Sequence, residues 1–292
     1  MISRMRYDYA LFLTAGIRSV SATKTIVLCA DDFGLNSGVT QGILKLVHMK
    51  RLSAVSCMVN MPAFIPHAKE LLALKNPVKI GLHFNLTEGN LLSIPNKPCF
   101  SLNELLIKTH LSSIKLSFIA KEFNQQLEQF VQVMGYFPDF IDGHQHVHQF
   151  PRIRQVILDV YEQQLREHGT FIRSTWPAIS TDAYQFKAKI LAVTGGKALH
   201  TQLVERVIPH NAYFSGIYDF APTTNYRALF RSWLSMLSNN TLIMCHPGEA
   251  STEPDSISPA RQIEWSYFSS NAFIDDCKEY GVTLSPKEIA LN

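Results

Sequence analysis

Short apolar runs alternate with amphipathic stretches along most of this chain. Such runs are typical of buried strands in a parallel sheet, whereas apolar positions at helical spacing predict the helices that cover it. The predicted strands are Thr25–Ala30, Ala54–Val59, Val78–Phe84, Phe140–Gly143, Thr170–Arg173, Leu242–Cys245 and Val282–Leu284. The predicted helices cover residues 37–48, 62–74, 114–134, 151–168, 184–192, 225–237 and 259–280.

Strands and helices that alternate in this way predict an α/β fold with a mostly parallel sheet. We expect a deformed (β/α) barrel, similar to a TIM barrel, that forms a single domain over residues 24–292. An open doubly wound sheet is the alternative. Residues 1–23 are predicted to be an N-terminal extension, although a weak signal peptide or a misplaced start would also account for them. Residues 85–100 form a loop long enough to cover a substrate.

Composition and charge exclude several classes of protein. The net charge is only +3 and the chain has no run of Lys or Arg, so we do not expect it to bind nucleic acid. The five cysteines are scattered and lack CxxC spacing, which is typical of reduced thiols and predicts a cytoplasmic protein. No stretch is long enough to span a membrane. A homodimer is compatible with this sequence.

Four polar clusters follow predicted strands. They are Asp31-Asp32, the segment 81–87 (GLHFNLT), the segment 142–148 (DGHQHVH), and His246-Pro247-Gly248. Because the carboxyl ends of parallel strands meet at one rim of a barrel, we expect these clusters to converge there. A single histidine such as His83 or His246 would otherwise fit a core position or a turn equally well.

The adjacent acids Asp31 and Asp32 have two interpretations. Either residue is a good cap for the helix predicted from Ser37. Alternatively, both serve one site at the point where the chain leaves the sheet. Like charges this close push their pKa values apart, which suits one acid as a metal ligand and the other as a base.

The third cluster is the most specific. Asp142, His144, His146 and His148 recur with a period of two, so an extended backbone would direct all four to one side. A solvated loop is the simpler interpretation, but four such groups on one face favour a metal site. Imidazole and carboxylate suit zinc, cobalt, nickel, manganese or iron, and magnesium where waters complete the shell. A carboxylate beside the metal would serve as a base, and a histidine opposite would protonate a leaving amine.

Together these four motifs, in this order and with the segment 214–218 (FSGIY), resemble the YdjC-like carbohydrate deacetylases. The resemblance runs from about Thr25 to Ser285 and implies a deformed barrel, a divalent metal that is usually magnesium, and hydrolysis of N-acetyl groups on sugars. It implies that the metal ligands are Asp32, His83 and His144. Asp31 matches the general base of the family and His246 an active-site histidine.

Asp142, His146 and His148 match positions of the family's third motif, and the resemblance gives them no direct role in metal binding or catalysis. Arg173 either orients Asp31 or the substrate, or forms an ordinary salt bridge. We therefore expect a metal-dependent hydrolase that removes N-acetyl groups from an amino sugar or a glycolipid headgroup. The alternatives are a metal-dependent hydrolase of another amide or a phosphoester, and a non-catalytic sugar-binding protein.

Overall fold

A computed structural model describes residues 23–75 and 78–285 of the chain. The N-terminal extension predicted over residues 1–23 therefore lies, apart from Thr23, outside the described residues. Among the described residues, no helix combines the length and the apolar character needed to cross a membrane.

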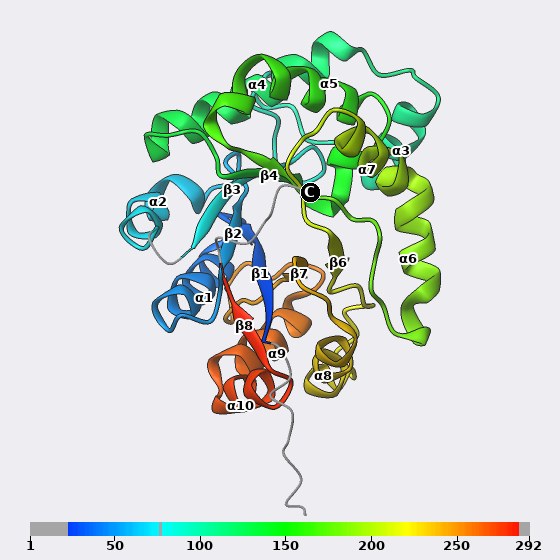
Figure 1. Cartoon of the computed structure of the whole chain (residues 1–292). Coiled ribbons are helices and arrows are strands. Elements are labelled where there is room, and N and C mark those ends of the chain that lie inside the picture. Colours follow the sequence, from blue (N-terminus) through cyan, green and yellow to red (C-terminus); the bar gives the residue numbers. More distant parts are fainter. Residues whose placement is uncertain (1–22, 76–77, 286–292) are drawn as a thin grey trace, which may run out of the picture.

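A parallel sheet forms the centre of the molecule (Figure 1). Its main path has the order β5-β4-β3-β2-β1-β7-β6, and β8 pairs with the start of β1. The strands are β1 (Lys24–Phe33), β2 (Ala54–Cys57), β3 (Lys79–Phe84), β4 (Phe140–Gly143), β5 (Phe171–Ile172), β6 (Tyr213–Ser215), β7 (Thr241–Cys245) and β8 (Val282–Leu284). Every strand pair in the described sheet is parallel.

The sheet curls into a barrel that is incompletely closed. Between β5 and β6 there is no ladder among the described residues, and the gap is bridged where Ala178 pairs with Phe214. The Ile179 amide also donates to the Phe214 carbonyl at 2.7 Å. The deformed (β/α) barrel predicted from the sequence is thus confirmed, and the open doubly wound sheet is not the fold.

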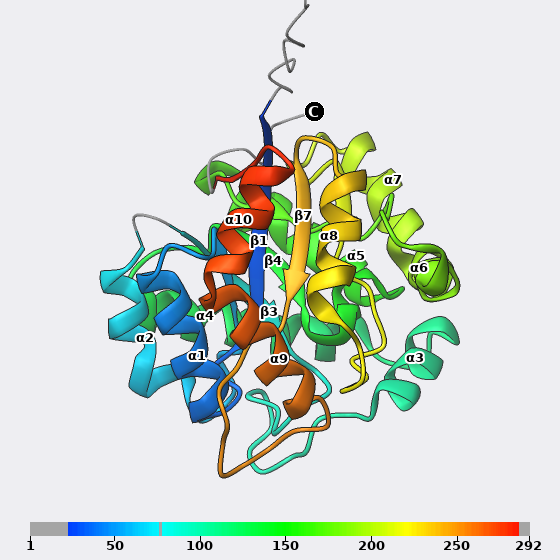
Figure 2. The same cartoon turned by 90° about the horizontal axis from the view of Figure 1, so that it is seen from below.

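Helices cover the outside of the sheet (Figure 1). They are α1 (Ser37–His48), α2 (Phe64–Ala73), α3 (Leu102–His110), α4 (Leu116–Met134), α5 (Ile153–Val160), α6 (Gln185–Leu191), α7 (Lys197–Glu205), α8 (Tyr226–Met236), α9 (Ser258–Ser269) and α10 (Asn271–Glu279). In Figure 2 the strands β1 and β7 lie side by side, flanked by α10 and α8. Their carboxyl ends point to the lower edge of that view, where the loop of residues 85–100 lies.

Two apolar cores follow from the alternation of side chains along the strands. In β1, Ile26, Leu28 and Ala30 belong to the core beneath the helices, whereas Val27 and Cys29 belong to a smaller core inside the barrel. Alternate residues of a strand point to opposite faces, so a strand buried on both sides is apolar throughout. For this reason the predicted strands appeared as continuous apolar runs.

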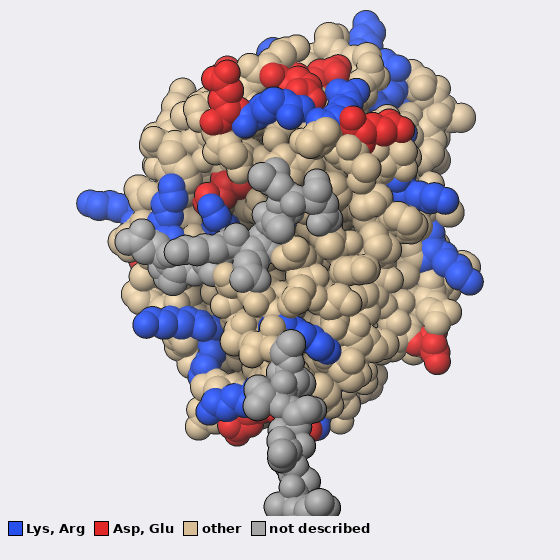
Figure 3. Space-filling view, viewed as in Figure 1, with Lys and Arg blue, Asp and Glu red and all other residues tan. Residues whose placement is uncertain are grey.

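Three short elements have no counterpart in the prediction, namely α3, α7 and β6. β6 has three residues and the two helices nine each. The single helix predicted over residues 259–280 is wrong, because Ser270 is extended at ψ 163° and separates α9 from α10. On the face seen in Figure 3, basic and acidic side chains are interspersed over a mostly uncharged surface.

Candidate active site

At the carboxyl end of several strands, the side chains that point into the barrel are polar and form one layer. By strand alternation, Asp31 follows Val27 and Cys29 in β1, His83 follows Gly81 in β3, and His246 follows Met244 after β7. The other members of this layer are Ser56 of β2, Asp142 of β4 and Arg173 after β5. The polar clusters therefore converge at the carboxyl rim, as the sequence predicted.

A cavity of about 580 Å³ opens over this layer. All five predicted site residues line it, namely Asp31, Asp32, His83, His144 and His246. Apolar residues also line it, namely Leu35, Leu102, Phe220, Met244 and Ile257, together with polar ones such as Glu88, Gln145 and Ser256. A cavity that combines apolar lining with a few convergent polar groups is the usual form of a small-molecule site.

A break in the strand lets adjacent acids serve the same cavity. The register of β1 against β2 shifts between Ala30 and Phe33, and Asp32 has a left-handed backbone with φ 69°. This bulge interrupts the alternation that would otherwise direct Asp32 to the helix side. The alternative role as a helix cap is wrong, because the Asn36 side chain caps α1 by accepting from the Val39 amide.

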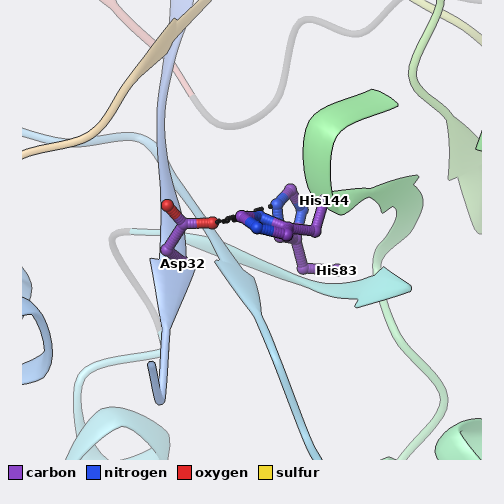
Figure 4. A group of neighbouring side chains, drawn as sticks. All are labelled: Asp32, His83 and His144. Carbon is purple, nitrogen blue, oxygen red and sulfur yellow. Dashed lines mark hydrogen bonds and ion pairs between the residues drawn. The ribbon is translucent and has the colours of Figure 1, made fainter. Parts of the chain in front are cut away.

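Asp32, His83 and His144 converge on one point (Figure 4). Their potential ligand atoms all lie within 4.8 Å of one another. The Asp32 Oδ1 atom is 2.9 Å from His144 Nδ1 and 3.3 Å from His83 Nε2. One carboxylate oxygen and two imidazole nitrogens are a common ligand set for a divalent metal and leave positions open for water and substrate.

The orientation of His83 fits such a site. Asp142 Oδ1 accepts from His83 Nδ1 at 2.6 Å, and Ser56 Oγ donates to the same oxygen at 2.5 Å. A carboxylate that holds the far nitrogen of a metal-binding histidine fixes its tautomer and leaves the other nitrogen for the metal. Burial would lower the pKa of His83, but Asp142 and Asp32 raise it to about 10. A metal bound here would therefore displace a proton from Nε2.

Arg261 of α9 holds the second oxygen of Asp32. Its guanidinium lies 2.7 Å from Asp32 Oδ2 and 2.6 Å from Asp255 Oδ2. Although burial alone would raise the pKa of Asp32, Arg261 and His144 hold it well below its usual range. Asp32 is thus kept ionised with Oδ1 directed at the histidines.

Arg173 forms the equivalent support for Asp31. It contacts Asp31 through two hydrogen bonds of 2.7 Å each and reaches Asp142 Oδ2 at 2.5 Å. Burial would raise the pKa of Asp31, but the Arg173 charge keeps it below its usual value. Arg173 thus forms salt bridges with two carboxylates of the site, and the one to Asp31 also holds that carboxylate in a fixed orientation. Cys29, Asp31 and Asp142 also form a compact donor group, but the Arg173 cation contacts all three and disfavours a metal.

The extended backbone predicted for residues 142–148 is found at Asp142 and Gly143 in β4 but is wrong from His144 onward. His144–Gln149 is a short helical turn, in which Gln145 and His146 have left-handed φ values of 51° and 59°. The turn separates the histidines, since His144 joins Asp32, His146 lines the cavity, and His148 is buried. His148 Nε2 lies 3.1 Å from the Arg173 carbonyl, so it supports the backbone that carries the Asp31 partner.

Glu264 of α9 anchors the backbone at His246. The His246 backbone amide donates to Glu264 at 2.5 Å, and Tyr218 donates to the other oxygen of the same carboxylate at 2.6 Å. The ring packs edge-on against Phe220, and its buried Nδ1 has no hydrogen-bond partner among the described residues. Burial lowers the pKa of His246 to about 4, so the ring is neutral at pH 7.

Glu264 makes the stability of the folded protein depend on pH. Burial raises its pKa to about 7 from the ordinary 4.5, although Tyr218, the His246 amide and Arg261 act in the opposite direction. Between these two values the folded protein keeps a proton that the unfolded chain has lost, so the free energy of unfolding falls as pH rises.

We expect Glu264→Gln to remove this pH-dependent loss. The free energy of unfolding of the wild type, minus that of the variant, should fall by about 3 kcal/mol across the window, given about 1.4 kcal/mol per pKa unit. Urea unfolding of both proteins at several pH values measures it. Glu128→Gln, at an exposed position of α4, is the control. A difference that stays constant with pH would show that Glu264 is ionised throughout.

Sequence reasoning assigned no role to Ser56, Arg261, Glu264 or Tyr218, although Tyr218 lies in the segment 214–218 that resembles the family. Ser56 had a detectable signal, because it is a hydroxyl in an otherwise apolar strand and has the same alternation as Ala54. Arg261 and Glu264 lie three residues apart on α9, which places them on one helical face. Nothing in that spacing indicates that the face would meet Asp32 and His246.

Comparison with known proteins identifies the family. A model of the YdjC-like proteins matches residues 25–279, which is most of the chain. The chain belongs to the YdjC-like family. The resemblance found in the four motifs is thereby confirmed.

Similar proteins include a chitooligosaccharide deacetylase of Proteus mirabilis, which is 33% identical over 144 residues, covering 48% of this chain and 56% of that protein. A carbohydrate deacetylase of Danio rerio is 33% identical over 144 residues, covering 46% of this chain and 45% of that protein. The chain thus matches about half the length of these curated relatives. A solved structure described as a putative cellobiose-phosphate cleavage protein of Enterococcus faecalis V583 superposes with a TM-score of 0.70. It covers 92% of this chain and 100% of that one at 19% identity, a likeness that shows the fold alone.

Proposed function

We propose that this protein is a metal-dependent hydrolase that removes N-acetyl groups from an amino sugar or a glycolipid headgroup. The observation that supports it most is the convergence of Asp32, His83 and His144 beside Asp31, whose carboxylate is held by Arg173. Metal binding alone would not require a second, separately oriented carboxylate in the same cavity. The printed names of the two deacetylase relatives supply the substrate class.

The residues that would hold the metal are Asp32, His83 and His144. A divalent metal at this position would polarise the amide carbonyl and acidify water. Its identity is also a proposal, with Mg²⁺ implied by the family resemblance. Two imidazole nitrogens are ligands that Zn²⁺, Co²⁺, Mn²⁺ and Ni²⁺ accept more readily than Mg²⁺ does, so metal titration has to compare all five.

Asp31 acts as the general base in this proposal. Arg173 binds both carboxylate oxygens from one side and keeps the group ionised, which is the form that can accept a proton from the attacking water. Because Asp31 and Asp32 have different partners, one carboxylate can bind the metal while its neighbour moves a proton.

His246 delivers the proton to the leaving amine. Since burial keeps its ring neutral, His246 has to receive that proton during the reaction. Asp31 is the group that takes up a proton, from the attacking water. Both residues line the cavity, and the charge of each affects the pKa of the other. Expulsion of an unprotonated amine is unfavourable, so this step limits an ordinary amide more than an activated substrate.

We therefore expect His246→Gln to slow hydrolysis of an ordinary N-acetyl substrate by about 10²-fold or more and that of an N-trifluoroacetyl analogue much less. Metal content and substrate binding should stay close to wild type. Turnover of both substrates by both proteins measures it. Equal losses on the two substrates would make His246 a positioning residue and leave His146 as the proton donor.

The overall proposal is tested by product analysis. Metal-loaded protein is incubated with N-acetylglucosamine oligomers, simple N-acetyl amides and phosphoesters, and acetate, amine and phosphate are measured. We expect acetate and free amine from the sugars at the highest rate. Phosphate release, or equal cleavage of amides without a sugar, would favour the alternative hydrolase. Binding of the oligomers without any product would favour the non-catalytic sugar-binding protein.

A further inference from the structure

The cavity contains one aromatic side chain besides its histidines. Among the described residues that line it, Phe220 is the only Phe, Tyr or Trp. Its side chain is partly exposed, whereas Tyr218 two residues earlier is buried. Phe220 therefore presents aromatic surface to the space above the polar floor.

The backbone at Phe220 is strained. Its φ of 58° lies in the left-handed region, which is an outlier for a bulky residue. Strained positions of this kind persist only where the surroundings hold them, and they concentrate at functional sites. The fold could avoid the strain with a glycine here, but a glycine would supply no ring.

The neighbouring residues hold this conformation. Asp219 accepts from the Ala221 amide at 3.1 Å and from Thr224 Oγ1 at 3.2 Å, which closes the turn after Phe220. Before it, the Tyr218 hydroxyl is anchored on buried Glu264. The strained residue is thus fixed from both sides and its ring has a defined place in the wall.

The ring is also positioned relative to the reacting groups. Its centroid lies 5.0 Å from that of His246 at an interplanar angle of 88°, and 4.4 Å from that of Tyr218. A molecule in contact with the cavity side of Phe220 would therefore lie beside the histidine to which we assign the proton for the leaving amine.

We propose that Phe220 is the platform that binds the apolar face of the pyranose ring whose acetyl group is removed. This inference rests on the proposed function and names the part of the substrate that the wall recognises. One face of a pyranose carries mainly C–H groups, which contact an aromatic ring favourably through dispersion and weak C–H interactions. A flat, rigid ring also offers this area with little loss of side-chain entropy.

Three substitutions separate a platform from simple packing against His246. Phe220→Tyr keeps the aromatic face, Phe220→Leu keeps apolar bulk without it, and Phe220→Ala removes both. Phe186→Ala is the matched control, because Phe186 is 74% exposed on α6 and is not among the residues lining the cavity. Binding is measured by calorimetry on metal-loaded full-length protein that also carries Asp31→Asn, so that substrate is not consumed.

The probes are the N-acetylglucosamine trimer and acetate, which can occupy the polar floor but has no sugar ring. We expect Phe220→Leu and Phe220→Ala to weaken trimer binding about tenfold and to leave acetate binding unchanged. Phe220→Tyr and Phe186→Ala should bind both probes as the Asp31→Asn parent does. Trimer binding by Phe220→Leu that equals that of the parent would overturn the platform.

Acetate release from the trimer by the wild type is scored separately. If the trimer binds in a Phe220-dependent manner but is not cleaved, the platform stands and the proposed deacetylation fails. If the trimer is cleaved and its binding does not depend on Phe220, the platform alone fails. A wild type that neither binds nor cleaves the trimer would overturn both.

Discussion

Replacing Asp31 by Asn is expected to lower turnover by roughly 10²–10⁴-fold, the usual contribution of a general base. The change is nearly isosteric, and an amide oxygen can still accept from Arg173, so the fold and the metal site should be retained. What disappears is the negative charge that accepts the proton from water. The measurements are the rate of acetate release and the metal content of the same samples.

Asp159→Asn is the control for this substitution. Asp159 has a side chain that is 53% exposed and pairs with Arg206 at 3.8 Å, away from the cavity. It should leave both rate and metal content at wild-type values. An Asp31→Asn protein that turns over near the wild-type rate would make Asp31 a partner for Arg173 only, and the base would have to be another group.

Loss of any one of the three ligand side chains is expected to remove the metal. Asp32→Ala, His83→Ala and His144→Ala each leave two donors, too few to compete with water for a divalent ion at micromolar concentration. Because no metal remains, the rate should fall at least as far as in Asp31→Asn. Metal content after dialysis measures this directly.

His48→Ala and Asp159→Ala serve as controls for loss of an imidazole and of a carboxylate at exposed positions. Both should retain the metal. Full occupancy in any one of the three cavity variants would exclude that residue from the ligand set. Retention in all three would place the metal, if any, elsewhere.

The barrel and most of its rim could be predicted from the sequence because strand alternation is a local property. A run such as Ile26–Ala30 identifies a strand buried on both faces, and the first polar residue after it marks the rim. Asp31, His83 and His246 all follow that rule. Asp32 does not follow it. Its place in the site depends on a bulge that the residue types in β1 do not predict.

The segment 144–149 shows where pattern reasoning fails. A period of two implied an extended backbone, but Gln145 and His146 adopt left-handed conformations, so His144 and His148 point to different partners. Such conformations are set by tertiary contacts and not by local propensity. The structure nevertheless brings His144 beside Asp32 and His83, because His144 directly follows β4 at the carboxyl rim.

The supports of the site were harder to predict because they come from distant parts of the chain. Arg261 lies 229 residues after Asp32, and Arg173 lies 142 residues after Asp31. Charge pairs of this separation leave no local pattern in one sequence. These charge pairs can be recognised only in the folded structure, where the barrel brings α9 and β5 to the same rim.

The central claim is that a divalent metal held by Asp32, His83 and His144 is required for release of acetate from an N-acetylated sugar. It is tested by removing metal from the wild-type protein with a chelator, confirming the loss by elemental analysis, and measuring acetate release while each metal is added back. We predict no measurable release from the metal-free protein and a rate that rises in proportion to occupancy, up to one ion per chain. Full acetate release by protein shown to be metal-free would contradict the account.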